Sequence, residues 1–169
     1  VKLERYKQNK FPRCIQKMSR LERLSILHSN ITELPSWLSE LSSLTHLSIW
    51  GCRSLSNDEQ IAESLLGCHS LTHFRFSSFQ WKTHPDVYIA ISELENIEIV
   101  DISHHKCDEN ILRNMDLRGL RMSLKQWEMW HEALLGFSRL ELLEIKDGWG
   151  HSRKVHIGDT LGKLKSLRN

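Results

Sequence analysis

The chain has 169 residues, a length that fits one domain. Apolar residues make up 40% of it and charged residues 26%, which is the composition of a globular protein and not of a disordered one. The 23 basic and 21 acidic residues leave a net charge of +2, so the charge does not require a nucleic-acid partner or an anionic membrane surface. No run approaches the roughly 18 consecutive apolar residues of a membrane span.

The cysteines are few and unevenly spaced. They are Cys14, Cys52, Cys68 and Cys107, each in an apolar stretch of sequence. A disulfide framework would place cysteines more densely and more regularly. The pattern therefore predicts reduced, buried thiols in an intracellular protein.

The motif L-x-x-L-x-L recurs along the chain, with other large apolar residues replacing some of the leucines. Six copies begin at residues 21, 44, 71, 97, 117 and 140, so that successive copies start 20 to 27 residues apart. This spacing falls in the range of about 20–29 residues that is typical of leucine-rich repeats. The copies at Ile97 and Leu117 are the weakest, and the first of them has an alternative register that starts at Leu94.

The connector before each of the first two copies contains a proline. Phe11-Pro12 and Leu34-Pro35 precede matching apolar positions, so the two connectors align residue for residue. Proline there suits an extended or turn backbone that needs no amide donor. The next connector differs, because Ser56-Asn57-Asp58-Glu59 predicts a capping box at the start of a helix that contains Ile61, Leu65 and Leu66 and ends at Gly67.

The later connectors are longer and more varied. Residues 80–94 form the most irregular connector and are expected to carry an insertion. A short helix is predicted within residues 108–115. A further helix is predicted to open with a capping box of Ser123 and Gln126 and to end at Gly136.

These repeats predict one fold. Each unit has a short strand and a returning segment and cannot bury its leucines alone, so stacked units share a continuous core. We therefore expect a right-handed leucine-rich-repeat solenoid of the α/β class, with a short parallel sheet on the concave face and irregular and helical connectors on the convex face. Residues 1–169 would form a single domain of about seven to eight partial or complete repeats. Leu3 fits the sixth position of a strand whose start is missing and Leu167 would open another repeat, so we expect a fragment of a longer array.

The ninth position of such a repeat usually holds Asn or Cys, whose side chain ties the buried strand ends together. In this chain the position is occupied by several residue types, so we expect the ladder to be largely absent and the solenoid to be irregular and less rigid. The residues at this position are Ser29, Cys52, Phe79, His105, Lys125 and Gly148.

The inner face of the sheet is the candidate binding surface. Strand side chains alternate, so the positions between the leucines point away from the core and form columns with one residue per repeat. Tryptophan and arginine, which are frequent in binding hot spots, fall in these columns. The predicted partner-binding residues are Arg23, His46, Trp50, His73, Arg75, Asp101, Arg121 and Glu144.

Two stretches of sequence carry a family resemblance. Residues 21–41 contain Ser-Asn-Ile-Thr-Glu-Leu-Pro-Ser-Trp-Leu, and residues 44–55 contain Ile-Trp-Gly-Cys-Arg-Ser-Leu. The Leu-Pro connector and the Gly-Cys strand end resemble the leucine-rich-repeat region of plant intracellular nucleotide-binding immune receptors. Residues 161–167 resemble the approach to another repeat of the same kind.

This resemblance implies a recognition and autoinhibition module. Such a module binds a pathogen effector or a guarded host protein, and it contacts the nucleotide-binding domain of its receptor. The resemblance implies no cofactor in this segment, because the receptor would bind ADP or ATP in a separate domain. It also implies a cytoplasmic or nucleocytoplasmic location, with no membrane or nucleic-acid partner.

A second resemblance involves a single repeat. The spacing of its apolar, cysteine and aspartate residues is similar to that of the cysteine-type repeats of F-box ubiquitin-ligase adaptors, which would make the chain a substrate-binding module. The residues concerned are Cys52, Leu55, Asp58, Ile61, Cys68 and Leu71.

Three segments match catalytic or metal-binding motifs only in part. Residues 158–163 resemble a phosphate loop but have three residues between the glycines instead of four. His131-Glu132 begins like a zinc-protease helix and lacks the second histidine. His104, His105 and Cys107 have no partner motif at zinc-site spacing. The sequence therefore predicts neither an enzyme nor a metal site.

Overall fold

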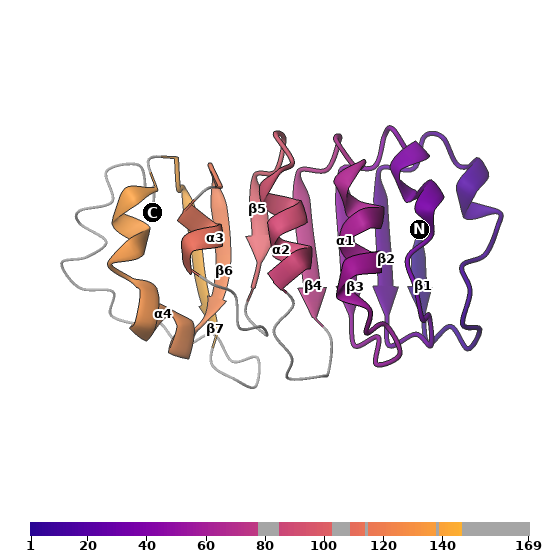
Figure 1. Cartoon of the computed structure of the whole chain (residues 1–169), viewed down its shortest axis with the longest axis horizontal. Helices are drawn as coiled ribbons and strands as arrows, with labels where there is room; N and C mark the ends of the chain where they lie inside the picture. Colours follow the sequence, from indigo (N-terminus) through magenta and orange to yellow (C-terminus); the bar gives the residue numbers. More distant parts are fainter. Residues whose placement is uncertain (78–84, 103–108, 114, 138, 147–169) are drawn as a thin grey trace.

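The computed structural model describes residues 1–77, 85–102, 109–113, 115–137 and 139–146, and of residues 109, 113 and 135 it describes the backbone alone. Within this range the chain forms one open, seven-stranded parallel sheet, whose strands lie side by side in chain order (Figure 1). The strands are β1 (Lys2–Glu4), β2 (Arg23–Leu27), β3 (His46–Trp50), β4 (His73–Ser77), β5 (Ile99–Asp101), β6 (Gly119–Ser123) and β7 (Leu142–Lys146).

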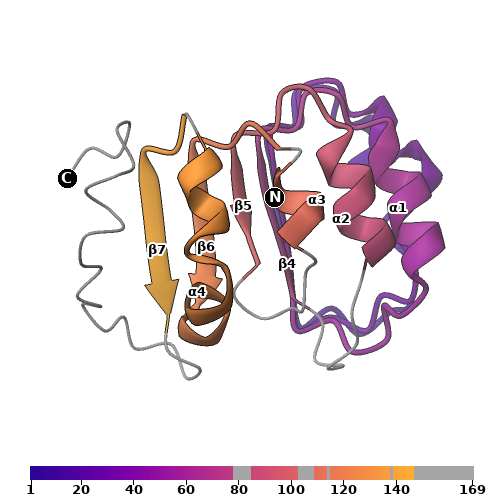
Figure 2. The same ribbon diagram turned by 60° about the vertical axis from the view of Figure 1, so that its left-hand side comes forward.

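The connectors cover one side of this sheet (Figures 1 and 2). The two proline-containing connectors hold the short 3-10 helices η1 (Ile15–Lys17) and η2 (Ser36–Glu40). The longer connectors hold α-helices and one further 3-10 helix, namely α1 (Asp58–Leu66), α2 (Pro85–Ser92), α3 (Glu109–Arg113), α4 (Leu124–Trp130) and η3 (Ala133–Gly136). None of the helices in the described ranges is long and apolar enough to span a bilayer.

The strand pairing confirms the predicted repeats. Parallel pairing matches the same position of each motif from one strand to the next. In the fourth copy Val100 pairs with Phe74, which fixes the register that starts at Ile97 and excludes the one that starts at Leu94. Leu3 pairs with Ile26, so Leu3 occupies the sixth position, as predicted. The chain is a leucine-rich-repeat solenoid of the α/β class.

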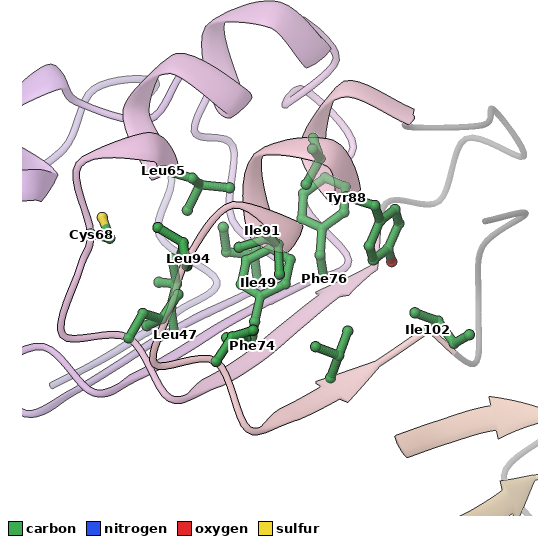
Figure 3. Packing of buried hydrophobic residues seen from close by; sticks show 14 of the residues in the cluster. Leu47, Ile49, Leu65, Cys68, Phe74, Phe76, Tyr88, Ile91, Leu94 and Ile102 are labelled. Atoms are coloured by element: carbon green, nitrogen blue, oxygen red, sulfur yellow. The ribbon is translucent and has the colours of Figure 1, made fainter. Parts of the chain in front are cut away.

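The core lies between the sheet and the connectors. The apolar residues of the six motifs are buried, except for the partly buried Leu143, and Figure 3 shows some of them packed against side chains from the helices. Burial of one such side chain contributes about 1.5–3 kcal/mol, and β2, β3, β4 and β6 each contribute two, whereas β5 and β7 each contribute one. Residues of this cluster include Leu47, Ile49, Phe74 and Phe76 from the sheet and Leu65, Tyr88 and Ile91 from the helices.

The predicted helix ends are confirmed in part. Helix α1 ends at Gly67 as expected, whereas α4 ends at Trp130 and only the separate 3-10 helix η3 extends to Gly136.

Helix α4 begins with the expected capping box, because Ser123 accepts from the backbone N–H of Gln126 and Gln126 accepts from that of Ser123. At α1 the prediction was wrong by one residue. The N-cap is Asn57, whose side chain accepts from the backbone N–H of Gln60, and Ser56 lies outside the helix.

The connector at residues 80–94 is more regular than expected. Residues 85–92 form the complete helix α2, which begins with Pro85. Proline suits this place because the first residues of a helix need no intrahelical donor. The remainder of the expected insertion, residues 80–84, lies outside the described residues.

Side chains at the ninth position link neighbouring repeats, although we expected this ladder to be largely absent. The hydroxyl of Ser29 donates to the carbonyl oxygen of Leu3 at 3.3 Å. The sulfur of Cys52 lies 3.7 Å from the carbonyl oxygen of Ile26. Each of these carbonyls belongs to the sixth position of the preceding repeat. The ninth position thus links β1 to β2 and β2 to β3. Phe79, His105 and Gly148 lie outside the described residues.

In the fifth copy of the motif, which begins at Leu117, the neighbouring residue makes this link. Lys125, at the ninth position, is exposed, and the side chain of Gln126 donates to the carbonyl oxygen of Ile102 at 3.0 Å. Gln126 can do this because α4 begins directly after β6 and turns its first residues back over the sheet. The same side chain therefore caps a helix and joins two repeats.

The cysteines differ in environment. Cys14, Cys52 and Cys68 are all free thiols, but Cys14 is exposed, which corrects the expectation that every thiol is buried. Burial raises the pKa of Cys52, and it raises the pKa of Cys68 to about 11. Cys107 lies outside the described residues.

Replacing Gln126 should weaken the fold measurably. The Gln126→Ala variant removes half of the capping box and the donor for the buried Ile102 carbonyl, so we expect a loss of about 1–3 kcal/mol in the free energy of unfolding. Urea denaturation measures this loss. The matched control is Lys125→Ala, one residue earlier and exposed, which should change stability by less than about 0.5 kcal/mol. Equal effects of the two substitutions would refute the linking role.

The thiols should react in a fixed order. Alkylation needs the thiolate, so the exposed Cys14 should react with iodoacetamide in the native protein, whereas Cys52 and Cys68 should react only after unfolding. Mass spectrometry of peptides after native and denaturing alkylation resolves each site. Native labelling of Cys68 as fast as that of Cys14 would contradict the packing around α1.

Candidate functional site

The side of the sheet turned away from the connectors, called here the open face, carries three columns of side chains. Pairing of equivalent positions aligns these columns from strand to strand, as the sequence predicted. The first column contains Arg23, His46, His73, Ile99, Gly119 and Leu142, and the second contains Ser25, Ser48, Arg75, Asp101, Arg121 and Glu144. The third contains Leu27, Trp50, Ser77, Ser123 and Lys146, and its predicted member Ser103 lies outside the described residues.

Trp50 and Arg75 form a stacked pair. They lie diagonally on β3 and β4, and the guanidinium carbon of Arg75 sits 4.2 Å from the centre of the indole ring. A cation over an aromatic face is favourable by about 0.5–2 kcal/mol, depending on how far it is desolvated. The Trp50 side chain is half-buried and supports Arg75, whose side chain remains 36% exposed. The pair therefore presents an oriented guanidinium rather than two separate anchors.

Asp101 is not an exposed residue of this face. It lies in the expected column, but its side chain is only 3% exposed, because basic side chains from both sides cover it. Its Oδ2 atom is 3.3 Å from Nε of Arg75 and 3.5 Å from Nζ of Lys146. A buried carboxylate needs such counterions. Asp101 therefore fixes Arg75 and Lys146 in place, and direct contact with a partner through Asp101 is excluded in this arrangement.

The charges on the last two strands are paired with one another. Nε of Arg121 donates to Oε2 of Glu144 at 2.6 Å, and Nζ of Lys146 lies 3.7 Å from the other oxygen of Glu144. The predicted alternation of charge sign along the second column thus takes the form of ion pairs across neighbouring strands. Through Lys146 and Asp101 these pairs connect to Arg75 on β4.

His46 and His73 form a second stacked pair on β3 and β4. Their ring centres are 4.0 Å apart and the ring planes differ by 18°. Nδ1 of each ring is hydrogen-bonded at 2.8 Å to the hydroxyl of the preceding threonine, Thr45 or Thr72. These threonines hold the rings upright and leave Nε2 of each ring for a partner, because no hydrogen bond to it occurs within the described part of the chain.

Both imidazoles resist protonation. Burial lowers the pKa of His46, and the nearby His73 and Arg23 lower it further, while Glu22 opposes the change. Burial also lowers the pKa of His73, with Arg23 and Arg121 acting in the same direction and Glu98 against them. The pair is therefore mainly neutral at pH 7.

Sequence reasoning missed the supporting residues of this face. Thr45 and Thr72 were not selected, although the repeated tripeptide Leu-Thr-His at residues 44–46 and 71–73 was a visible signal. Lys146 was placed in the third column but not chosen as a site residue. No sequence signal showed that it would reach Asp101 two strands away.

Other places on the described chain offer less chemistry. A hollow of about 380 Å³ lies where strands β4 to β6 begin, and two of the charged residues that line it, Asp116 and Arg139, form an ion pair at 2.8 Å. Within the described residues no group of three or more His, Cys, Asp or Glu side chains could hold a metal ion. The near-motifs at residues 104–107 and 158–163, and the expected repeat at 161–167, lie outside the described residues.

Comparison with known proteins finds similarity among solved structures. No family model and no curated protein matches the chain. Among solved structures the chain is similar to an internalin (inlF) from Listeria monocytogenes, with 15% sequence identity and a TM-score of 0.41. The match covers 97% of this chain and 64% of the internalin, so the chain spans less than two thirds of that protein. The fold assignment follows from the repeats and strand register of the chain itself.

The histidine pair should make stability depend on pH. Because folding lowers both pKa values, the unfolded chain binds protons more readily near pH 6.5, and the stability contributed by the neutral pair is lost as the pH falls through this region. We expect a lower urea midpoint at pH 5.5 than at pH 7.5, and a smaller difference in the double variant His46→Gln/His73→Gln. The control His69→Gln changes an exposed histidine in a turn and should keep the full difference. An unchanged difference in the double variant would show that other groups cause it.

Proposed function

We propose that the chain is a protein-recognition module that binds its partner on the open face, around Trp50 and Arg75. The observation that carries this proposal is the oriented guanidinium of Arg75, stacked on Trp50 and paired with a buried carboxylate. A side chain already held in place loses little entropy on binding. The guanidinium can also form a bidentate contact with an acidic group.

The finer proposal is a recognition and autoinhibition module of an intracellular plant immune receptor, acting in the cytoplasm. It binds a pathogen effector or a guarded host protein and contacts a nucleotide-binding domain of the same receptor. The resembling sequence features have structural roles that support it. Gly51 has φ 67°, which favours glycine, and Cys52 is buried and reaches the carbonyl of Ile26. The motif Gly-Cys thus ends the strand and ties it to the preceding repeat.

A second candidate is the substrate-binding module of an F-box ubiquitin-ligase adaptor. The observation that favours it is the repeat between β3 and β4, where the helix α1 is flanked by the buried Cys52 and Cys68. The coding sequence upstream of Val1 distinguishes the two candidates. A nucleotide-binding domain with a phosphate loop supports the receptor, and an F-box supports the adaptor.

Substitutions in the stacked pair should weaken partner binding. In the full-length protein, Trp50→Ala and Arg75→Glu should each cost about 2 kcal/mol or more of binding free energy, because hot-spot side chains are lost. The measurement is affinity purification with quantitative mass spectrometry, followed by titration of the partner found. Trp50→Ala should unfold within a few degrees of the parent, because its indole is only half-buried.

The controls are exposed residues away from the open face. Met129→Ala on α4 matches the loss of an apolar side chain, and Arg20→Glu in a connector matches the charge reversal. Both controls should retain the partner. A partner retained equally by Trp50→Ala and Arg75→Glu would place recognition on the connectors or the lateral edge instead.

A further inference from the structure

On the open face of β2 to β4, basic and aromatic side chains surround the small residues Ser25 and Ser48; we call the surrounding side chains the basic frame. Ser48 sits at the centre of nine paired positions, three from each strand. The hydroxyls of Ser25 and Ser48 make no hydrogen bond within the described part of the chain, and both residues are half-buried. The frame around them consists of Arg23, His46, His73, Arg75, Trp50 and Leu27, with Ser77 at one corner.

This frame carries positive charge that no nearby described carboxylate neutralises. On the open face of β2 to β7 the described columns contain four cations, Arg23, Arg75, Arg121 and Lys146, and two anions, Asp101 and Glu144. Both anions are engaged with the last three cations in that list. No described carboxylate lies within 4.0 Å of Arg23. The unneutralised charge is therefore at the β2 to β4 end.

The other end of the first column is apolar. Ile99 on β5 lies over Gly119 on β6, since a Cβ atom at Gly119 would come within 3.0 Å of the Ile99 side chain. Leu142, the next member of the column, is 44% exposed. A basic subsite and an apolar subsite thus lie on the same face of one sheet, separated along the direction that crosses the strands.

The spacing of the two subsites defines a ligand. Measured across the strands, Ser48 on β3 and Gly119 on β6 are separated by three strand spacings of about 4.8 Å, roughly 14 Å. An extended peptide covers this distance in about four residues at ~3.3 Å per residue. We propose that an acidic, extended segment of a partner protein crosses the strands of the open face, with a carboxylate above Ser48 and, about four residues away, an apolar side chain against Ile99 and Leu142.

This inference rests on the proposed function and adds the chemistry of the partner. The carboxylate accepts from the guanidinium groups of Arg23 and Arg75 and from the hydroxyl of Ser48. Trp50 and the Asp101 carboxylate hold the guanidinium of Arg75 in place for this contact. The apolar side chain of the partner packs against Leu142, which is 44% exposed in the unbound chain.

Labelled synthetic peptides test the proposal with the full chain. The first peptide carries Glu and Leu at the proposed spacing in a Ser/Thr scaffold, the second has Gln in place of Glu, and the third has Ser in place of Leu. By fluorescence anisotropy we expect the first to bind at least about tenfold more tightly than either of the others. Equal binding of the Glu and Gln peptides, or of the Leu and Ser peptides, would overturn the corresponding subsite.

Paired variants separate a local site from general attraction. Arg23→Glu should weaken binding of the first peptide by about tenfold, whereas Arg20→Glu, with the same charge change three residues earlier, should leave it unchanged. Leu142→Ser should weaken it, whereas Met129→Ser, at a side chain that is 64% exposed on α4, should not. Equal effects within either pair would refute the subsite concerned.

The remaining outcomes assign the face to another occupant or separate the two proposals. A phosphoserine peptide that binds more tightly than the Glu peptide would replace the carboxylate by a phosphate. Self-association that is lost in Leu142→Ser, without peptide binding, would assign the face to a second copy of the chain. Absence of peptide binding, together with loss of the native partner in Trp50→Ala, would refute this inference and leave the proposed function standing.

Discussion

Each repeat of this protein can bury its leucines only against the next repeat, so the parallel register between neighbouring strands governs every other feature. Matching positions of the motif pair across all six strand boundaries. Because strand side chains alternate, this register gives a continuous core on one side and columns of side chains on the other. Links from Ser29, Cys52 and Gln126 to the preceding repeat add polar connections at the strand ends. The backbone position of each strand residue on the open face is thus set by contacts outside that face.

The fold could be predicted because its information is local and repeated. A motif of period near 23 residues identifies the strands, and prolines and caps identify many of the connectors. The details that could not be predicted depend on contacts between repeats. The ladder is one of them, since Gln126 makes its link from one residue beyond the usual position. Helix α2 is another, because the packing of Tyr88 and Ile91 against the sheet outweighs a weak local signal.

The candidate site was predictable as a set of positions and not as a set of contacts. Alternation along a strand assigned Trp50, Arg75 and Asp101 to the same face, and the structure agrees. Alternation does not say which neighbours a long side chain reaches. Arg75 can lean toward Trp50, and Lys146 can reach back across two strands to Asp101. These contacts depend on the lengths and charges of at least three side chains together. They bury the carboxylate of Asp101, which alternation alone predicted to be exposed.

The same contacts divide the open face into two parts with different roles. On β5 to β7 the ion pairs Arg121–Glu144 and Lys146–Asp101 satisfy the charges within the chain, so this part offers a partner mainly its apolar surface. On β2 to β4 the carboxylates are missing from the columns, and the cations and imidazoles face one another. An acidic partner should bind such a surface favourably, because its negative charge offsets the repulsion between basic groups that is present in the unbound protein. Asp101 connects the two parts, because it is paired with both Arg75 on β4 and Lys146 on β7. By neutralising Arg75, it keeps this guanidinium over Trp50 on the open face before any partner binds.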